Sequence, residues 1–417
     1  MNLPTGATED RYGKSLFSVR DILLVILAAL VMRGIFLGNP HMDVDEQFYL
    51  LTGGRMLDGA VPFVDIWDRK PIGLFLIFAF ANLFGNGVLA YEVMALLSVA
   101  ATGIIICAMA RRYADRWSAL LAGVGYVVVV NLLDGAGGQS PVYYNLLIAA
   151  SAFLVQRQLR SRVSVRLGGM IGTGAVIMLL CGIAIQVKYL VIGEGLFFGL
   201  VLMWLALRRF GVVPALGAGV LWVTIALLPT IAAIGYYAWI GELDALMFAN
   251  FHSIFLRPED PLDWQIDRLL AIAEVLTVPL SIGIAGLALS RGMAMTEDQR
   301  SGRRFAIGWA ASAWIAFIIF GTYFKHYALP LAGPTMLLFA CATGRWRRLR
   351  TLIVILGAVW GVRSPLLTSE NEVGTATLNR IVSTMGDSRN CPFVFRGPSV
   401  VYHLGDFCLP TAYVFPY

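Results

Sequence analysis

Three acidic side chains stand close together near the start of the sequence, directly after its first apolar segment. Asp43, Asp45 and Glu46 lie in the segment that begins at His41. Clustered like charges raise the pKa of at least one member, which suits a proton acceptor working near neutral pH. The acids could instead cap the helix that follows at its positive N-terminus. The sequence requires no cofactor, although the three acids could also hold one divalent metal ion.

Two basic side chains come later in the same polar segment, directly before an apolar run. Arg69 and Lys70 precede Pro71, and the apolar run ends near Phe84. Proline is favoured at the start of a helix, and a helix N-terminus offers free N–H groups and partial positive charge. Together with two cations, these groups would form a seat for a phosphate. The alternative is that both side chains only pair with anionic lipid headgroups.

Four further basic side chains are candidates for the same anion. Arg257 lies in the polar segment 239–267, and Lys325 and His326 share a short turn between two apolar runs. Lys188 also falls between two apolar runs. These side chains could bind the anionic part of a substrate, or they could reach from the membrane to its polar surface.

The elements that position these residues are membrane helices. The chain is 58% hydrophobic and only 14% charged, whereas a soluble protein carries about a quarter charged residues. Apolar runs of the length that crosses a bilayer recur along the sequence, which predicts an all-α polytopic membrane protein with about eleven transmembrane helices. We place them near 21–38, 88–110, 117–133, 141–156, 168–186, 190–207, 213–238, 268–290, 305–322, 328–343 and 351–366. The net charge of +6 does not indicate nucleic-acid binding, because the basic residues form short clusters between these runs.

The charge distribution predicts the orientation of the chain. Basic residues concentrate in alternate connections, which are therefore cytoplasmic, and acidic residues in the others. This pattern predicts a multi-pass protein of the inner membrane with a cytoplasmic N-terminus and a periplasmic C-terminus. Residues 1–366 form one transmembrane domain, in which the periplasmic loop 39–87 carries the site and interfacial helices over 46–58 and 71–84. Residues 367–417 form a short periplasmic segment, in which Cys391 and Cys408 could pair in an oxidising compartment.

These residues resemble those of a known superfamily. The segment Asp43-Val-Asp-Glu-Gln-Phe-Tyr49 resembles the D-x-D-E-x-x-Y stretch that follows the first span of GT-C membrane glycosyltransferases. Lys70-Pro-Ile is similar to their K-P-P or K-P-I element, and residues 323–330 to their late H-Y-x-L-P turn. More narrowly, the chain is similar to aminoarabinose lipid A transferases and protein O-mannosyltransferase-like enzymes. The resemblance in topology covers nearly the whole chain, and that in motifs is concentrated in residues 41–85.

The resemblance implies an inverting glycosyltransferase that uses a polyprenyl-phosphate sugar donor. It places Asp45 at the position of the catalytic carboxylate, the general base on the acceptor hydroxyl, and Lys70 at the departing phosphate. The acceptor would be a periplasmic glycan, lipid or protein, and membrane lipids are the other expected partners. A lipid-phosphate donor requires no nucleotide site, which agrees with the lack of a Gly-rich phosphate loop in the sequence.

Other functional classes remain open at this point. A transporter or flippase for a lipid-linked saccharide would place polar residues near the middle of the bilayer, often in repeated halves. A periplasmic glycan polymerase or ligase would favour a large outer loop late in the chain, whereas the informative loop here comes first. A structural subunit without activity is the third alternative.

Overall fold

The computed structural model describes residues 18–40, 43–85, 87–160, 166–290, 292, 294–342, 346–369, 375–386, 391–395 and 397–414. The regular structure of these residues is helical, and they contain no β-strand. The all-α class is therefore confirmed. His41 lies outside the described residues. Residues 1–17, whose charges contribute to the predicted orientation, also lie outside them.

A helix lies at every position where the sequence predicts a transmembrane segment. These helices are α1 (Val19–Arg33), α4 (Gly87–Ala110), α5 (Arg116–Leu132), α6 (Ser140–Gln158), α7 (Leu167–Ile185), α8 (Ile192–Phe210), α9 (Val212–Trp239), α11 (Leu262–Leu289), α12 (Glu297–Phe320), α13 (Leu329–Phe339) and α14 (Arg347–Ser369). Among the described residues, 6 helices are long and apolar enough to cross a membrane, namely α4, α7, α8, α9, α11 and α12. With 11 residues, α13 is about 16 Å long, shorter than a hydrocarbon core of about 30 Å. The count of about eleven spans therefore stays a prediction.

The outer surface of the bundle is apolar over long stretches. On α9, for example, Val213, Val220 and Ile231 are exposed although they are large aliphatic side chains. Soluble proteins rarely expose contiguous apolar surface on this scale, whereas lipid tails cover it without cost. Together with the candidate spans, this surface identifies a multi-pass membrane protein.

Two shorter helices form in the loop between the first two long helices, as predicted. They are α2 (Val44–Leu57) and α3 (Ile72–Asn82), and Pro71 directly precedes the second. Asp43 caps α2, because its side chain accepts a hydrogen bond of 2.8 Å from the backbone N–H of Asp45. A side chain at Gly53 of α2 would place its Cβ 2.4 Å from the backbone nitrogen of Ala79 in α3. The backbones of the two helices are therefore in direct contact, which fixes α3 relative to α2.

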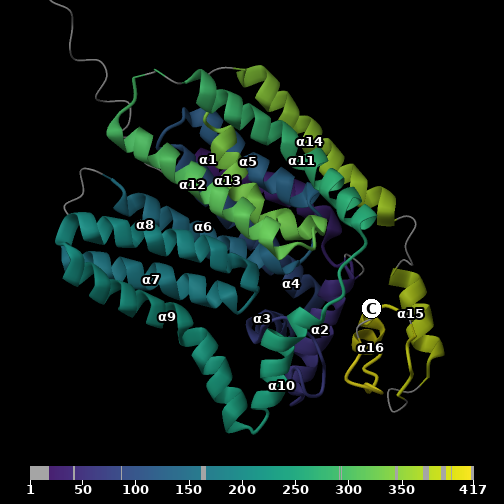
Figure 1. The fold of residues 1–417 in the computed structure, drawn as a ribbon. Helices are drawn as coiled ribbons and strands as arrows, with labels where there is room; N and C mark the ends of the chain where they lie inside the picture. Colours follow the sequence, from purple (N-terminus) through teal and green to yellow (C-terminus); the bar gives the residue numbers. More distant parts are fainter. Residues whose placement is uncertain are drawn as a thin grey trace, which may run out of the picture.

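The remaining helices are short and gather mostly at one end of the bundle. Besides the 3₁₀ turns η1 (Gly34–Phe36) and η2 (Tyr189–Val191), they are α10 (Leu243–Met247), the turns η3 (Phe248–His252) and η4 (Ser253–Leu256), η5 (Lys325–Ala328), α15 (Thr375–Thr384) and α16 (Val400–Leu404). Figure 1 shows α2, α10, α15 and α16 together at this end, beyond the long helices.

The C-terminal segment packs against the loop 39–87, which carries most of the candidate residues. A disulfide joins Cys391 to Cys408, which resolves the pairing that the sequence left open. Next to it, Arg55 of α2 donates a hydrogen bond of 2.6 Å to the carbonyl oxygen of Phe407. The backbone N–H of Trp67 donates to the carbonyl oxygen of Ala412 at 2.9 Å. The tail thus braces both α2 and the turn before Lys70. The predicted boundary after residue 366 falls inside α14, which continues to Ser369.

Candidate active site

Asp45 is the centre of a cluster of charged side chains from three separate segments. It lies in the first turn of α2, and its Oδ1 is 3.6 Å from Nζ of Lys70. Its Oδ2 is 3.8 Å from Nε2 of His326, in the turn η5. A second carboxylate, that of Asp68, lies 3.4 Å from Lys70 on the other side. The structure therefore brings together the acid, the lysine and the histidine that the sequence predicts for one site.

A close contact between α3 and the end of α7 adds Lys188 to this cluster. The backbone N–H of Leu74, in the first turn of α3, donates to the carbonyl oxygen of Gln186 at 3.1 Å. A Cβ at Gly73 would lie 2.7 Å from that same oxygen, so only glycine allows the approach. The contact places Lys188, two residues after Gln186, beside Lys70.

Aromatic rings and a second group of charges complete the surroundings. Nζ of Lys188 lies 3.4 Å from the centre of the Tyr327 ring, a cation–π contact. Arg257 interacts with the Tyr327 hydroxyl and lies 3.9 Å from Asp260. Asp260 also accepts a hydrogen bond of 2.6 Å from Arg268 on α11. Arg257 therefore lies next to the site, where it contacts Tyr327 rather than Asp45.

The electrostatics keep the central pair ionised. Burial acts to raise the pKa of Asp45, but Lys70 and the other neighbouring groups together outweigh it, and the pKa falls below the usual value. Burial acts to lower the pKa of Lys70, but Asp45 and Asp68 raise it overall. Burial and the charge of Lys188 lower the pKa of His326 to about 3, so its imidazole is neutral near pH 7. Burial, followed by the charge of Lys70, lowers the pKa of Lys188 well below its usual value.

The other two acids of the predicted catalytic set have different surroundings. Burial and the neighbouring Asp45 charge raise the pKa of Asp43 to about 7. Glu46 is fully buried against Gly137, and burial together with Asp43 raises its pKa well above the usual value. Among the described residues, the positive charge that acts on Glu46 is that of Arg33 of α1, which donates to the carbonyl oxygens of Gly135 and Gly137. The carboxyl of Glu46 thus packs into the protein and supports the loop around residue 137.

Two of the predicted phosphate-binding cations point elsewhere. The Arg69 guanidinium lies over the Trp67 ring, 5.4 Å from its centre. Nζ of Lys325 pairs with Asp134 at 2.7 Å, and both side chains are partly exposed. Lys325 and His326 are adjacent in sequence, yet only the histidine lies next to Asp45. The described residues contain no group of three His, Cys, Asp or Glu side chains arranged to hold a metal ion.

Comparison with known proteins supports the fold. No protein-family model and no curated protein sequence matches the chain. The crystal structure of ArnT from Cupriavidus metallidurans bound to undecaprenyl phosphate is similar, with 16% identity and a TM-score of 0.58 over 95% of this chain and 75% of that one. The chain has the GT-C fold. A crystal structure of the Archaeoglobus fulgidus oligosaccharyltransferase tethered to an acceptor peptide matches with 11% identity and a TM-score of 0.51, over 94% of this chain and 59% of that one.

The GT-C fold was the expectation drawn from residues 41–85 and from the late turn at 323–330. That expectation is confirmed at the level of the fold. The second ArnT structure, in the apo state, matches with a TM-score of 0.58 over 87% of this chain. Besides Asp68, which lies next to Lys70, the residues that the sequence missed are Arg268 and Asp260. Neither belongs to a motif, and their approach to the turn at Thr322 depends on how α11 packs.

Proposed function

We propose that this protein is a membrane glycosyltransferase that moves a sugar from a polyprenyl-phosphate carrier to a periplasmic acceptor, with inversion at the anomeric carbon. The observation that carries the proposal is the partly buried Asp45–Lys70 pair, at 3.6 Å, at one end of a GT-C fold. The undecaprenyl phosphate bound to ArnT supports the class of donor. The charge pattern of the connections supports a site on the periplasmic face of the inner membrane.

In the proposed reaction, Asp45 accepts the proton of the acceptor hydroxyl while its oxygen attacks the anomeric carbon. The bond between that carbon and the phosphate oxygen breaks, and its electron pair leaves with the polyprenyl phosphate. Lys70 stabilises the charge that develops on the phosphate, since fixed cations aimed at a developing charge lower the barrier most. A single displacement from the face opposite the phosphate inverts the anomeric carbon.

Because Lys70 lies between two carboxylates, we expect donor binding to precede the activation of Asp45 as a base. Before the donor binds, Lys70 is shared between Asp45 and Asp68. A donor phosphate that draws the ammonium toward itself removes part of the charge that depresses the pKa of Asp45. Asp45 then becomes a stronger base in the presence of the donor, when a base is required.

Lys188 and His326 would contribute as groups whose protonated forms are favoured when the donor binds. Burial beside other cations lowers the pKa of Lys188 and brings that of His326 to about 3, so the His326 imidazole is neutral in the free site. The phosphodiester of the donor carries one negative charge, which favours their protonated forms, so donor binding should take up protons. Arg257, which reaches Tyr327, would act on the same anion from further away.

A reconstituted assay tests the proposal. The purified protein, in lipid nanodiscs, is incubated with a panel of polyprenyl-phosphate sugars, and release of polyprenyl phosphate is measured by mass spectrometry. Lys70→Met should lower donor turnover roughly 10- to 100-fold, since a hydrogen bond to a charged group contributes about 1.5–3 kcal/mol. Lys325→Met is the matched control, because that lysine pairs with Asp134 at the exposed rim. Equal turnover of the two variants, or no turnover of any donor, would contradict the proposal.

A further inference from the structure

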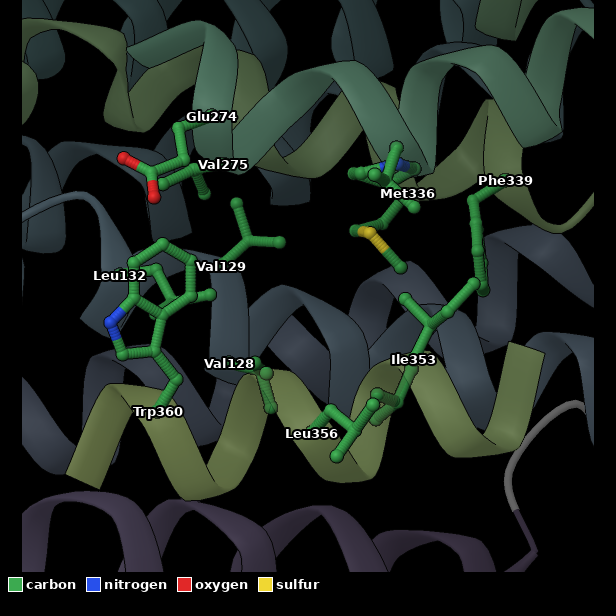
Figure 2. A pocket seen from close by; sticks show the side chains of 14 residues that line it. Val128, Val129, Leu132, Glu274, Val275, Met336, Phe339, Ile353, Leu356 and Trp360 are labelled. Carbon is green, nitrogen blue, oxygen red and sulfur yellow. The ribbon is translucent and has the colours of Figure 1, made fainter. Parts of the chain in front are cut away.

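A cavity lies apart from the Asp45 site, between the helices α5, α11, α13 and α14. It has a volume of about 420 Å³, within the range of about 300–1,000 Å³ typical of small-molecule sites. Its lining is apolar apart from one carboxylate, that of Glu274 (Figure 2). No residue of the Asp45 cluster contributes to it.

Glu274 is the chemically distinctive residue of this cavity. It lies on α11, one of the candidate membrane spans, and its side chain is exposed. Within the part of the chain that the structure describes, no hydrogen bond or ion pair joins its carboxylate to another residue. An ionisable side chain at membrane depth is costly without a partner and marks a binding site by default. A ligand that supplies a positive charge would satisfy it.

The surroundings of Glu274 also suit a cation. The indole of Trp360 lines the same cavity, and in Figure 2 it lies on the same side as the Glu274 carboxylate. Met336 and Phe339 lie on the other side of this view. An indole face attracts ammonium groups, whereas the aliphatic and thioether side chains accept a hydrocarbon chain. The cavity therefore has a cation-attracting part and an apolar part, as an amphipathic ligand requires.

The position of Glu274 along α11 relates the cavity to the active-site end of the bundle. Arg268, on the same helix, donates to Asp260 and to the carbonyl oxygen of Thr322 beside the turn that carries His326. Glu274 follows Arg268 by six residues, which is about 9 Å along a helix axis. The carboxylate therefore lies slightly below the active-site level, at a depth that the headgroup of a lipid from the same leaflet can reach.

We propose that this cavity binds a phospholipid with a primary amine, of the phosphatidylethanolamine class. Its ammonium pairs with Glu274 beside Trp360, and part of one acyl chain lies in the apolar portion of the cavity. The donor's prenyl phosphate is the less suitable occupant, because its anionic head would face an anionic side chain. The proposal does not depend on the transferase reaction.

Lipid retention tests the proposal. The protein is reconstituted in nanodiscs with equal amounts of phosphatidylethanolamine, phosphatidylcholine and phosphatidylglycerol, with a polyprenyl phosphate added, and is then extracted into detergent. Native mass spectrometry measures which lipids stay bound. We expect phosphatidylethanolamine to be retained about tenfold over the others, because a primary ammonium forms charge-assisted hydrogen bonds with a carboxylate. Glu274→Gln should abolish this preference without filling the cavity.

A pair of tryptophan variants on α11 separates occupancy from general effects. Val278 lines the cavity and Ile284 does not, although the side chains are similarly exposed, at 45% and 55%. Val278→Trp should remove the retained phosphatidylethanolamine, and Ile284→Trp should leave it. Undiminished preference in Glu274→Gln, equal retention of phosphatidylcholine, or preferential retention of polyprenyl phosphate would overturn the proposal. If Val278→Trp does not fold, the result of Glu274→Gln still decides.

Discussion

A methyl group added at Gly73 should disable the site without touching any charged residue. In the wild-type structure, a Cβ at this position would lie 2.7 Å from both the carbonyl oxygen and the Cβ of Gln186. Ordinary van der Waals contact begins at 3.4 Å, so the first turn of α3 and the end of α7 must separate by about 0.7 Å. The backbone carbonyl cannot rotate away as a side chain could. Lys70 is attached to the first of these segments and Lys188 to the second.

The expected cost has a structural and a kinetic part. Overpacking of this kind costs about 1–3 kcal/mol of stability, and weakening the 3.1 Å hydrogen bond from Leu74 to Gln186 adds to it. Misplacement of a catalytic group by about 1 Å lowers rates roughly 100-fold. For a shift of about 0.7 Å, we expect donor turnover by Gly73→Ala to fall roughly 10- to 100-fold.

The assay for this variant is polyprenyl-phosphate release in nanodiscs, with thermal unfolding measured in parallel. Gly217→Ala is the matched control, since Gly217 lies inside α9 and its added Cβ would meet nothing within 4 Å. Alanine there should keep turnover and raise stability slightly, by about 0.5–1 kcal/mol. Wild-type turnover by Gly73→Ala would refute the idea that contact between α3 and α7 sets the spacing of the two lysines.

Three other perturbations test separate parts of the account. Because the pKa of Asp43 is about 7, ionisation above that pH adds a negative charge beside Asp45 and should weaken donor binding, seen as a KM that rises with pH. Asp43→Asn keeps a good helix cap and should flatten this KM profile, so an unchanged profile would exclude Asp43 as its source. Cys408→Ser opens the bridge to Cys391 and should lower the unfolding free energy by about 3 kcal/mol in denaturant titration, with no change counting against a stabilising role. Glu46→Gln should keep turnover near that of the wild type, because the raised pKa favours the neutral form of Glu46, which glutamine resembles; a loss above about tenfold would show that its charge is required.

The helices could be predicted from the sequence because each is encoded locally. A capping acid at Asp43 and a proline at residue 71 mark the starts of α2 and α3, and apolar runs mark the long helices. Length is the exception. α13 lies where a span was predicted, but its 11 residues are too few to cross a bilayer by themselves. An apolar segment is one that avoids water, and a segment buried among other helices is as apolar as one that faces lipid. Apolar composition alone therefore does not tell a membrane span from a buried helix.

The candidate site was predictable only in part, because side-chain direction depends on tertiary packing. Lys70 and His326 reach Asp45, whereas their sequence neighbours Arg69 and Lys325 face Trp67 and Asp134. In a turn, adjacent side chains point in different directions, and spacing alone does not say which points inward.

The position of Lys188 in the site could not be predicted from the sequence around it. Its place in the site depends on the contact between Gly73 and Gln186, which joins segments far apart in the sequence. The docking of the C-terminal tail on α2 could likewise not be predicted from local sequence. The two cysteines suggested a closed loop, but not that Phe407 would meet Arg55.

The rate of donor consumption by Asp45→Asn tests the central claim most directly. Asparagine preserves the size of the side chain but cannot accept the proton of the acceptor hydroxyl. Turnover of the polyprenyl-phosphate sugar should fall by about 10²–10⁴-fold, the usual contribution of a positioned base. Donor affinity should stay the same or rise, since Lys70 is no longer shared with a carboxylate at 3.6 Å. A variant that turns over the donor at the wild-type rate would contradict the role of Asp45 as the base.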